Sequence, residues 1–396
     1  MNRIVVTGIG VISSIGNTVE ENRMSLMKGI SGITKIDKSF PSKFAGVLPF
    51  GEIKTSTEKF KEQLEAHEPG LTRNSLLALH AFEEAVTNAG ITATQLQSFD
   101  TTLVGATTIG GICLTDQLYK DASAAKEGSA YLASYDCASV YMYLQERFAI
   151  NGIVNTINTA CSSSANAIMY GARLIKNGRA KRAIVGGVDC IAKFTLNGFN
   201  SLFILSPDLC TPFDAARKGL NLGEGAAFLV LEKEEDCAGK TIYAALAGYG
   251  NSNDAYHPSS LSEDGDGPYL AMSGALESAG LLPSDISFIN AHGTATENND
   301  EVESKAMLRL FEKQPAFAST KSYTGHTLGA AAAIEAVYSI LNLTHQEIYP
   351  ALHYKDPIAS TGLIPVQSYT KTTVKHVMSN SFGFAGNCSS LIFSKA

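Results

Sequence analysis

The sequence predicts an α/β fold built from two similar halves, and three observations lead to this prediction. The chain has 396 residues, more than one hydrophobic core ordinarily organises, so two domain-sized units are expected. Short runs rich in β-branched residues alternate with longer segments in which apolar residues recur at helical spacing. Each half also combines a strand, a turn with a reactive side chain and a helix of small residues, at Cys161 with 162–176 and at His326 with 328–343.

The elements of the first half follow from local patterns. We expect the pair Gly8 and Gly10 to turn the chain out of its first strand. A dinucleotide-binding turn is a weak alternative there, because Ser13 takes the place of the third glycine. Residues 31–70 are mixed and polar and are expected to be irregular. Strands are predicted at 3–7, 102–105, 153–157, 182–188 and 223–231, and helices at 71–89 and 162–176.

The charged segment 232–239 is the expected boundary, which divides the chain into residues 1–240 and 241–396. The second half repeats the alternation of the first. Its predicted strands are 241–246 and 286–290, and its predicted helices are 268–279, 299–311 and the Ala-rich 328–343.

Composition narrows the class of protein. Apolar residues make up 45% of the chain and the net charge is −7, which is typical of a globular protein and argues against a general nucleic-acid binder. The seven cysteines show no C-x-x-C spacing, which favours reduced thiols in the cytoplasm over a disulfide framework or a zinc site. No run of about 18 apolar residues is present, so no membrane span is expected.

Cys161 is the first candidate for chemistry. It lies between a predicted strand and a predicted helix, so its thiol would face unpaired N–H groups and the positive end of the helix dipole. Both stabilise the thiolate, which is the nucleophilic form, and we therefore expect Cys161 to be alkylated rapidly near neutral pH. The alternative is a buried structural cysteine.

His292 and His326 each lie beside a glycine at the end of an apolar segment, and Lys321 precedes the second histidine by five residues. Taken singly, a histidine in such a place is more often structural than catalytic. Together with Cys161, these side chains permit acyl transfer from a thioester to the thiolate, with two imidazoles stabilising an enolate or oxyanion. A cysteine hydrolase would leave one histidine and Lys321 unused, and the local spacings suggest no metal site.

Short motifs run through nearly the whole chain, and together, in this order, they are specific: VTGIG at 6–10, TACSS at 159–163, PFD at 212–214, GEGA at 223–226, HGTAT at 292–296, ND at 299–300, KS at 321–322, TGH at 324–326 and NSFGF at 380–384. In these motifs the chain resembles the β-ketoacyl-[acyl-carrier-protein] synthases of the elongating, decarboxylating type, within the thiolase superfamily. The resemblance implies a thiolase-like α/β fold of five layers, α-β-α-β-α, from two similar halves with mixed sheets. It also implies a homodimer, or a heterodimer with a related synthase.

The resemblance implies a decarboxylative Claisen condensation, in which an acyl group on Cys161 joins malonyl-acyl-carrier protein and a fatty-acyl, polyene or polyketide chain is extended. The acyl-carrier protein brings the phosphopantetheine arm, so no cofactor of the chain itself is expected. His292 and His326 would stabilise the enolate, and backbone N–H groups of Cys161 and Phe384 would form the oxyanion hole, with Phe384 as a gate. The other implied residues are Lys321 with a network of Asp300, Glu303 and Glu335, Thr294 and Thr296 for the phosphopantetheine arm, Ile109 on the acyl-pocket wall, and Phe382 beside the substrate.

The sequence departs from this family at the gate, where residues 383–388 are GFAGNC instead of GFGGTN. Alanine is strained at positive φ, so we expect Ala385 to restrict the gate and Ala385→Gly to broaden acyl acceptance, unless residue 385 keeps β-region angles. Segments 40–72 and 129–155 also match poorly, which leaves the acyl chain and the carrier open. Two alternatives remain: a non-condensing partner resembling a chain-length factor, which typically lacks the cysteine, and a thiolase-type acyltransferase, which usually has a second cysteine where His326 stands.

Overall fold

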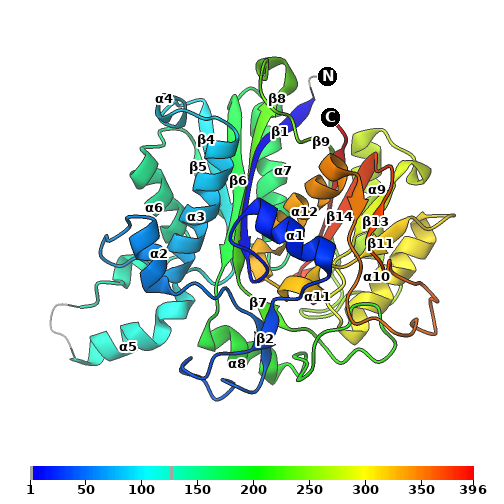
Figure 1. Ribbon diagram of the computed structural model, residues 1–396, viewed down its shortest axis with the longest axis horizontal. Coiled ribbons are helices and arrows are strands. Elements are labelled where there is room, and N and C mark those ends of the chain that lie inside the picture. Colours follow the sequence, from blue (N-terminus) through cyan, green and yellow to red (C-terminus); the bar gives the residue numbers. More distant parts are fainter. Residues whose placement is uncertain (1–2, 125–127) are drawn as a thin grey trace.

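The computed structural model describes residues 3–124 and 128–396, and Figure 1 shows helices on both sides of a long, twisted set of strands. The first half of the described chain contains β1 (Ile4–Ser13), α1 (Val19–Lys28), β2 (Ile33–Lys35), β3 (Pro49–Gly51), α2 (Thr57–Gln63), α3 (Arg73–Asn88), α4 (Ala93–Leu96), β4 (Thr101–Ala106), η1 (Gly110–Leu114), α5 (Thr115–Ala124), η2 (Leu132–Ser134), α6 (Ser139–Phe148), β5 (Val154–Ile157), α7 (Ser163–Lys176), β6 (Arg182–Asp189), α8 (Lys193–Ser201), β7 (Leu222–Gly223), β8 (Gly225–Lys233) and η3 (Glu234–Asp236).

The second half contains β9 (Ala244–Asn253), α9 (Asp266–Ala279), η4 (Pro283–Asp285), β10 (Phe288–Asn290), α10 (Glu297–Leu310), β11 (Ala316–Ala318), α11 (Lys321–Thr324), η5 (Leu328–Ala330), α12 (Ala331–His345), β12 (Glu347–Ile348), β13 (Thr370–Lys371), β14 (His376–Phe382), η6 (Phe384–Gly386) and β15 (Asn387–Ser394).

The two halves have the same strand order and the same strand directions. In the described residues, ten strands form one sheet in the order β11-β10-β14-β15-β9-β1-β8-β6-β4-β5. From its centre outwards, β1-β8-β6-β4-β5 therefore corresponds to β9-β15-β14-β10-β11. The pairs β1·β8 and β9·β15 are antiparallel, β6·β8 and β14·β15 are antiparallel, and β4 and β10 are parallel to both of their neighbours. The layout that repeats in the sequence is thus a repeat of topology.

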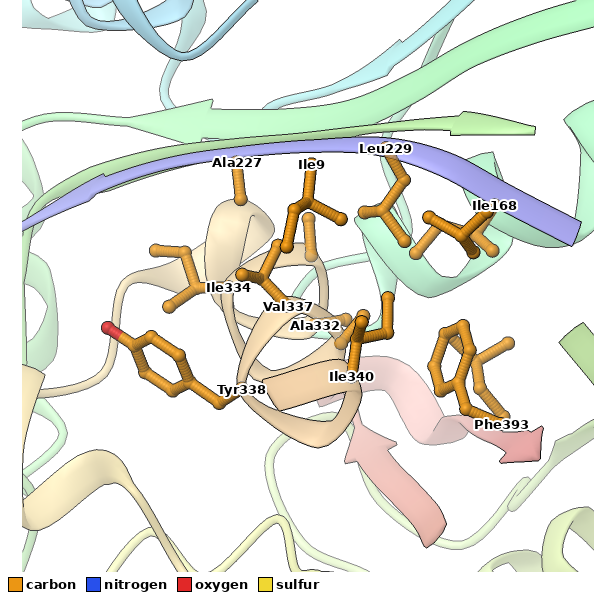
Figure 2. Packing of buried hydrophobic residues seen from close by; sticks show 14 of the residues in the cluster. Ile9, Ile168, Ala227, Leu229, Ala332, Ile334, Val337, Tyr338, Ile340 and Phe393 are labelled. Atoms are coloured by element: carbon orange, nitrogen blue, oxygen red, sulfur yellow. The ribbon is translucent and has the colours of Figure 1, made fainter. Parts of the chain in front are cut away.

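Helices α7 and α12 form the central layer, between the two parts of the sheet. Figure 2 shows Ile334, Val337 and Ile340 of α12 packed against Ile9 of β1 on one side, with Phe393 of β15 below. On the outer faces, α3 packs on β1 and β8, and α9 packs on β9 and β15. The structure therefore has the expected thiolase-like arrangement of five layers.

Gly8 and Gly10 lie inside β1, so the predicted turn out of the first strand is wrong. A Cβ atom at Gly8 would lie 2.3 Å from the carbonyl oxygen of Ala85, and one at Gly10 would lie 2.1 Å from that of Ala81. Both carbonyls belong to α3, so the two glycines allow this helix to pack directly on the strand. The Gly-x-Gly pair is a packing feature, not a dinucleotide-binding turn.

The same feature recurs in the second half. Gly248 and Gly250 lie in β9, and Cβ atoms there would come within 2.4 Å and 2.1 Å of the carbonyl oxygens of Ala275 and Ala271 in α9. Equivalent strands of the two halves thus carry the same Gly-x-Gly pair against equivalent helices. The repeat of the two halves is therefore visible in the amino-acid sequence at these positions.

Most predicted elements are confirmed with shifted ends: β4, β5, β6, β8, β10, α3, α7, α9, α10 and α12 lie where periodicity places them. The predicted boundary at residue 240 falls in the segment between β8 and β9. All seven cysteines lie in the described residues, and each has a free thiol. Among the described residues, none of the helices combines the length and hydrophobicity that a membrane crossing requires.

Candidate active site

Cys161 lies in a tight turn between β5 and α7. The residue before it, Ala160, has a left-handed backbone with φ 54°, and α7 begins at Ser163, two residues after Cys161. This turn buries the side chain, of which 6% is exposed, at the start of the central helix. The backbone N–H groups of Cys161 and Phe384 both face the sulfur, which is the placement expected of an oxyanion hole.

Burial raises the pKa of the Cys161 thiol to about 11, and the Lys321 ammonium and the N–H groups lower it by less. The expectation of a thiolate near neutral pH is therefore wrong for the resting structure. The position before a helix was predicted correctly, but the loss of water around the sulfur outweighs the helix end and the nearby positive charge. Cys161 is a neutral thiol here, and it must lose its proton during the reaction.

His326 contacts the sulfur directly. Its Nε2 lies 3.0 Å from Sγ of Cys161, and its Nδ1 accepts a hydrogen bond of 3.1 Å from the backbone N–H of Leu328. Because Nδ1 is an acceptor, the proton of the neutral ring is on Nε2. His326 therefore faces the reacting atoms as a hydrogen-bond donor.

His292 is oriented in the same way by a lysine. Nζ of Lys321 lies 3.3 Å from Nδ1 of His292, donates to the backbone oxygen of His292 at 2.6 Å, and pairs with Oε1 of Glu335 at 2.5 Å. An ammonium group can only donate, so Nδ1 accepts and the proton of His292 is also on Nε2. Lys321 is 1% exposed, so this orientation is protected from water.

The two imidazoles are neutral and converge on Cys161. Burial and the Lys321 charge hold the pKa of His292 and of His326 well below the usual 6.5. One ligand atom of each of the three side chains lies within 4.8 Å of the others. Sulfur and imidazole nitrogens of this kind could also hold a metal ion, a convergence that the sequence spacing did not indicate because the residues come from three separate loops. The absence of a metal stays a prediction.

The carboxylates predicted around Lys321 have separate partners. Glu335 alone of the three forms a hydrogen bond with Lys321, and burial raises its pKa to about 6. Glu303 accepts hydrogen bonds of 2.9 Å from the backbone N–H groups of His292 and Gly293, and burial raises its pKa to about 7. Of the predicted network, Glu335 therefore bonds to Lys321 directly, and Glu303 is linked to Lys321 through the backbone of His292, whose loop it holds.

Asp300 supports a different loop again. Its carboxylate accepts backbone hydrogen bonds from Phe213 at 2.7 Å and from Ala295 at 3.1 Å. It thus joins the PFD motif to the HGTAT motif and does not contact Lys321. Its contribution is to position the chain around Thr294 and Thr296, whose hydroxyl oxygens lie 2.9 Å apart.

Two cavities meet at Cys161. The first, of about 410 Å³, is called here the entrance cavity, and its lining includes Cys161, His292, His326, Thr294, Thr296, Phe382 and Phe384. The second, also of about 410 Å³, is called the acyl cavity, and its lining includes Cys161, Ile109, Ile112, Phe194, Phe199, Leu328 and Phe384. Thr294, Thr296 and Phe382 thus line the first cavity and Ile109 lines the second, while Phe384 lines both.

The loop that carries Phe384 has a strained residue. Ala385 has φ 63°, so the alternative of β-region angles is wrong and alanine pays the steric cost of the left-handed region. Its N–H donates to the backbone oxygen of Pro258 at 2.8 Å, and the Phe384 ring stacks on Phe199 with centroids 5.8 Å apart. The ring therefore rests between the two cavities.

Two contributors were missed by the sequence reasoning. Phe199 lines both cavities and stacks on the gate, but an aromatic on a helix carries no signal of this role. Oδ1 of Asn387, noted only as a departure, accepts from Ser162 at 2.7 Å, Asn166 at 2.8 Å and Asn251 at 3.1 Å. Asn387 thus links the end of the gate loop to Ser162, the residue after Cys161. In the sequence, the only sign of this role was that asparagine replaces the threonine usual in the family.

A duplicated thiolase-like fold, with a thiol and two donor imidazoles at the junction of its halves, defines a condensing enzyme of the acyltransferase class. Two family models match the chain: "Beta-ketoacyl synthase, N-terminal domain" over residues 1–237 and "Beta-ketoacyl synthase, C-terminal domain" over residues 243–355. The chain belongs to the β-ketoacyl synthase family, whose reaction is the condensation step of fatty-acid or polyketide synthesis.

Named relatives align with nearly the full length of the chain. The chain is 32% identical to 3-oxoacyl-[acyl-carrier-protein] synthase 2 of Vibrio cholerae, covering 99% of both chains. It is 33% identical to the mitochondrial 3-oxoacyl-[acyl-carrier-protein] synthase of Arabidopsis thaliana, covering 99% of this chain and 93% of that one. Among solved structures, the ishigamide ketosynthase/chain length factor matches with a TM-score of 0.93 and 31% identity, covering 100% and 99%. A type II polyketide ketosynthase in complex with its acyl-carrier protein matches with a TM-score of 0.90 and 26% identity, covering all of both chains.

Proposed function

We propose that the chain catalyses a decarboxylative Claisen condensation between an acyl group on Cys161 and malonyl-acyl-carrier protein. The observation that carries this proposal is the convergence of the Cys161 sulfur with the imidazoles of His292 and His326 where two cavities meet. One cavity suits the arm that brings a thioester, and the other suits the acyl chain that stays on the enzyme.

In the first step, Sγ of Cys161 attacks the thioester carbonyl of the incoming acyl group. The N–H groups of Cys161 and Phe384 stabilise the oxyanion, the bond to the carrier sulfur breaks, and the proton of Cys161 passes to that leaving sulfur. Thiol-for-thioester exchange needs no net proton acceptor, so it is compatible with a thiol whose pKa is raised.

In the second step, malonyl thioester binds with its carbonyl oxygen between the Nε2–H groups of His292 and His326. The bond to the carboxylate breaks, carbon dioxide leaves, and its electron pair forms an enolate that the two donors stabilise. Neutral imidazoles suit this role, since each already holds its proton on the nitrogen that faces the substrate.

In the third step, the enolate carbon attacks the acyl carbonyl on Cys161. The carbon–sulfur bond breaks, the 3-oxoacyl chain leaves on the carrier, and the Cys161 thiolate takes one proton from water. Phosphopantetheine arrives on the carrier and meets Thr294 and Thr296 in the entrance cavity, so the chain uses no cofactor of its own.

The chain works as a dimer, either with itself or with a related synthase. The solved relatives include ketosynthases described with their chain-length factors. Among the described residues, β5 is the outermost strand at one end of the sheet, and its Asn155 is exposed. This edge is therefore open to a strand of a partner chain. A non-condensing role is not favoured, because Cys161, both histidines and Lys321 are all in place.

Mass spectrometry of the protein with hexanoyl-acyl-carrier protein tests the first step, and carbon dioxide release from malonyl-acyl-carrier protein tests the second. We expect a hexanoyl adduct on Cys161, and we expect His292→Ala and His326→Ala each to abolish decarboxylation while Cys161 is still acylated. Loss of acylation in both folded histidine variants would contradict this division of roles. No adduct on the unchanged protein, under conditions in which it is folded, would contradict the condensing function itself.

A further inference from the structure

The rim of the entrance cavity carries a highly exposed aromatic side chain. Phe203 lies two residues after the last residue of α8 and lines the cavity beside the C-cap residue Leu202. The Phe203 side chain is 92% exposed and that of Leu202 is 48% exposed. Phe203 therefore contributes little to the hydrophobic core, although it is one of the largest apolar residues available.

The backbone of Phe203 is held in a conformation that glycine prefers. Its φ is 57°, at the position after a helix C-cap where glycine is usual and a residue with a Cβ atom is strained. Its N–H donates to the oxygen of Asn200 at 3.0 Å, and the next residue, Ile204, accepts from the N–H of Leu220 at 2.8 Å. The exposed ring is thus presented from a strained backbone that hydrogen bonds hold on both sides.

The same rim has little charge. Apart from the two neutral histidines, the titratable side chains that line the entrance cavity in the described residues are Cys161, Lys218 and Glu297. Lys218 pairs with Asp208 at 3.2 Å, and both are well exposed. The described residues that line the cavity therefore carry no excess of positive charge with which to attract an acidic partner.

We propose that Phe203, with Leu202 beside it, is the docking contact for the acyl-carrier protein, and that this contact is apolar and not electrostatic. The inference rests on the proposed function, because a phosphopantetheine arm that reaches Cys161 through this cavity places its carrier over the rim. A rigid, exposed aromatic loses little conformational freedom on binding, which is typical of residues that dominate the binding energy of an interface. The partner is thus a carrier that presents an apolar surface next to its phosphopantetheine serine.

The test compares Phe203→Gly with the unchanged protein on two substrates. These are the hexanoyl thioester of a bacterial holo-acyl-carrier protein and hexanoyl-N-acetylcysteamine, which carries the same acyl group without a carrier. We expect the KM for the carrier substrate to rise about tenfold, as for an interface anchor, and the rate with the small thioester to stay within about twofold. Because glycine relieves the strained backbone, the Tm should not fall.

A matched control and a salt series complete the test. Phe99, 80% exposed between α4 and β4, is the control, and Phe99→Ala should leave both substrates unaffected. For the unchanged protein we expect the carrier KM to vary less than about twofold between roughly 50 and 300 mM NaCl. An unchanged carrier KM in Phe203→Gly, or a KM that rises steeply with salt, would overturn this inference and leave the proposed function standing. Failure of the unchanged protein to take hexanoyl from either substrate would overturn both.

Discussion

The two halves of the molecule share one topology and use it for different chemistry. In the first, β5 leads through Cys161 into the buried helix α7, and in the second, β11 leads through Lys321 and His326 into the buried helix α12. The repeat brings the starts of both helices together, so that Nε2 of His326 lies 3.0 Å from the sulfur. Duplication thus supplies the geometry of the site, and a different side chain at each equivalent turn supplies the chemistry.

The loops after the equivalent strands β4 and β10 show the same division. Each is held by a buried carboxylate whose pKa burial raises. Asp189 accepts from Thr107, Thr108 and Ile109, and Oδ2 of Asp189 also accepts from the N–H of Gly329 in the other half at 2.7 Å. Glu303 holds the loop of His292 in the same manner. One loop therefore shapes the acyl cavity and the other carries a donor.

The largest expected effect concerns the reactivity of Cys161, the nucleophile in the turn of the first half. Since burial holds the pKa of Cys161 at about 11, the rate of its alkylation by iodoacetamide should rise about tenfold per pH unit, or about a thousandfold from pH 6.5 to 9.5. Peptide mapping measures this rate, and Cys161→Ser identifies labelling at the other six thiols. A rate that is already constant above pH 7 would show that Lys321 and the turn outweigh burial.

The next test asks whether the halves pack in the same way. Gly10→Ala in β1 and Gly250→Ala in β9 each place a Cβ atom 2.1 Å from a helix carbonyl oxygen. Backbone atoms cannot move aside cheaply, so each change should lower the free energy of unfolding by about 3 kcal/mol or prevent folding. Urea denaturation measures both, with Gly274→Ala as a control, because a Cβ there would meet its nearest neighbour only at 3.7 Å. A large loss of unfolding free energy in only one of the two variants would show that the halves do not pack in the same way.

The next effect is limited to a range of pH and concerns Glu303, the buried carboxylate of the His292 loop. The pKa of Glu303 is about 7 in the folded chain and 4.5 as its ordinary value, so its contribution to stability is fully present below pH 4.5 and is lost as the pH rises through 7. The loss amounts to about 3 kcal/mol. Glu303→Gln should remove this part of the pH dependence, which denaturation at a series of pH values measures. An unchanged profile would show that Glu303 ionises as an ordinary carboxyl group.

The smallest expected effect lies at the gate. Because Ala385 is strained at φ 63° in the observed loop, Ala385→Gly should stabilise this arrangement by about 1 kcal/mol. Long-chain acylation requires Phe384 to leave its place, so we now expect that acylation to become up to about fivefold slower, the reverse of the broadening expected from sequence alone. Acylation rates of Cys161 over a series of chain lengths measure this. Superimposable profiles would show that chain selection comes from Ile109 and the cavity wall.

The sequence by itself determined the α/β class, the repeated halves and the reactive residues. The turns at Cys161, His292 and His326 could be found because strand ends, glycines and helix starts are local features with short-range causes. That these residues meet at one site could also be predicted, because the motifs that contain them carry the family resemblance.

Tertiary structure alone decided how these residues behave. The pKa of Cys161 is raised by burial and lowered by the Lys321 charge and the Phe384 N–H, and local sequence specifies neither how much water remains nor which distant groups approach the sulfur. In the same way, Gly8 and Gly10 could be placed in a strand only once α3 was packed against them, because the clash that requires glycine lies in another element. Burial and close approach are properties of the assembled chain, and it is these that set the protonation of the nucleophile and the strain of the gate.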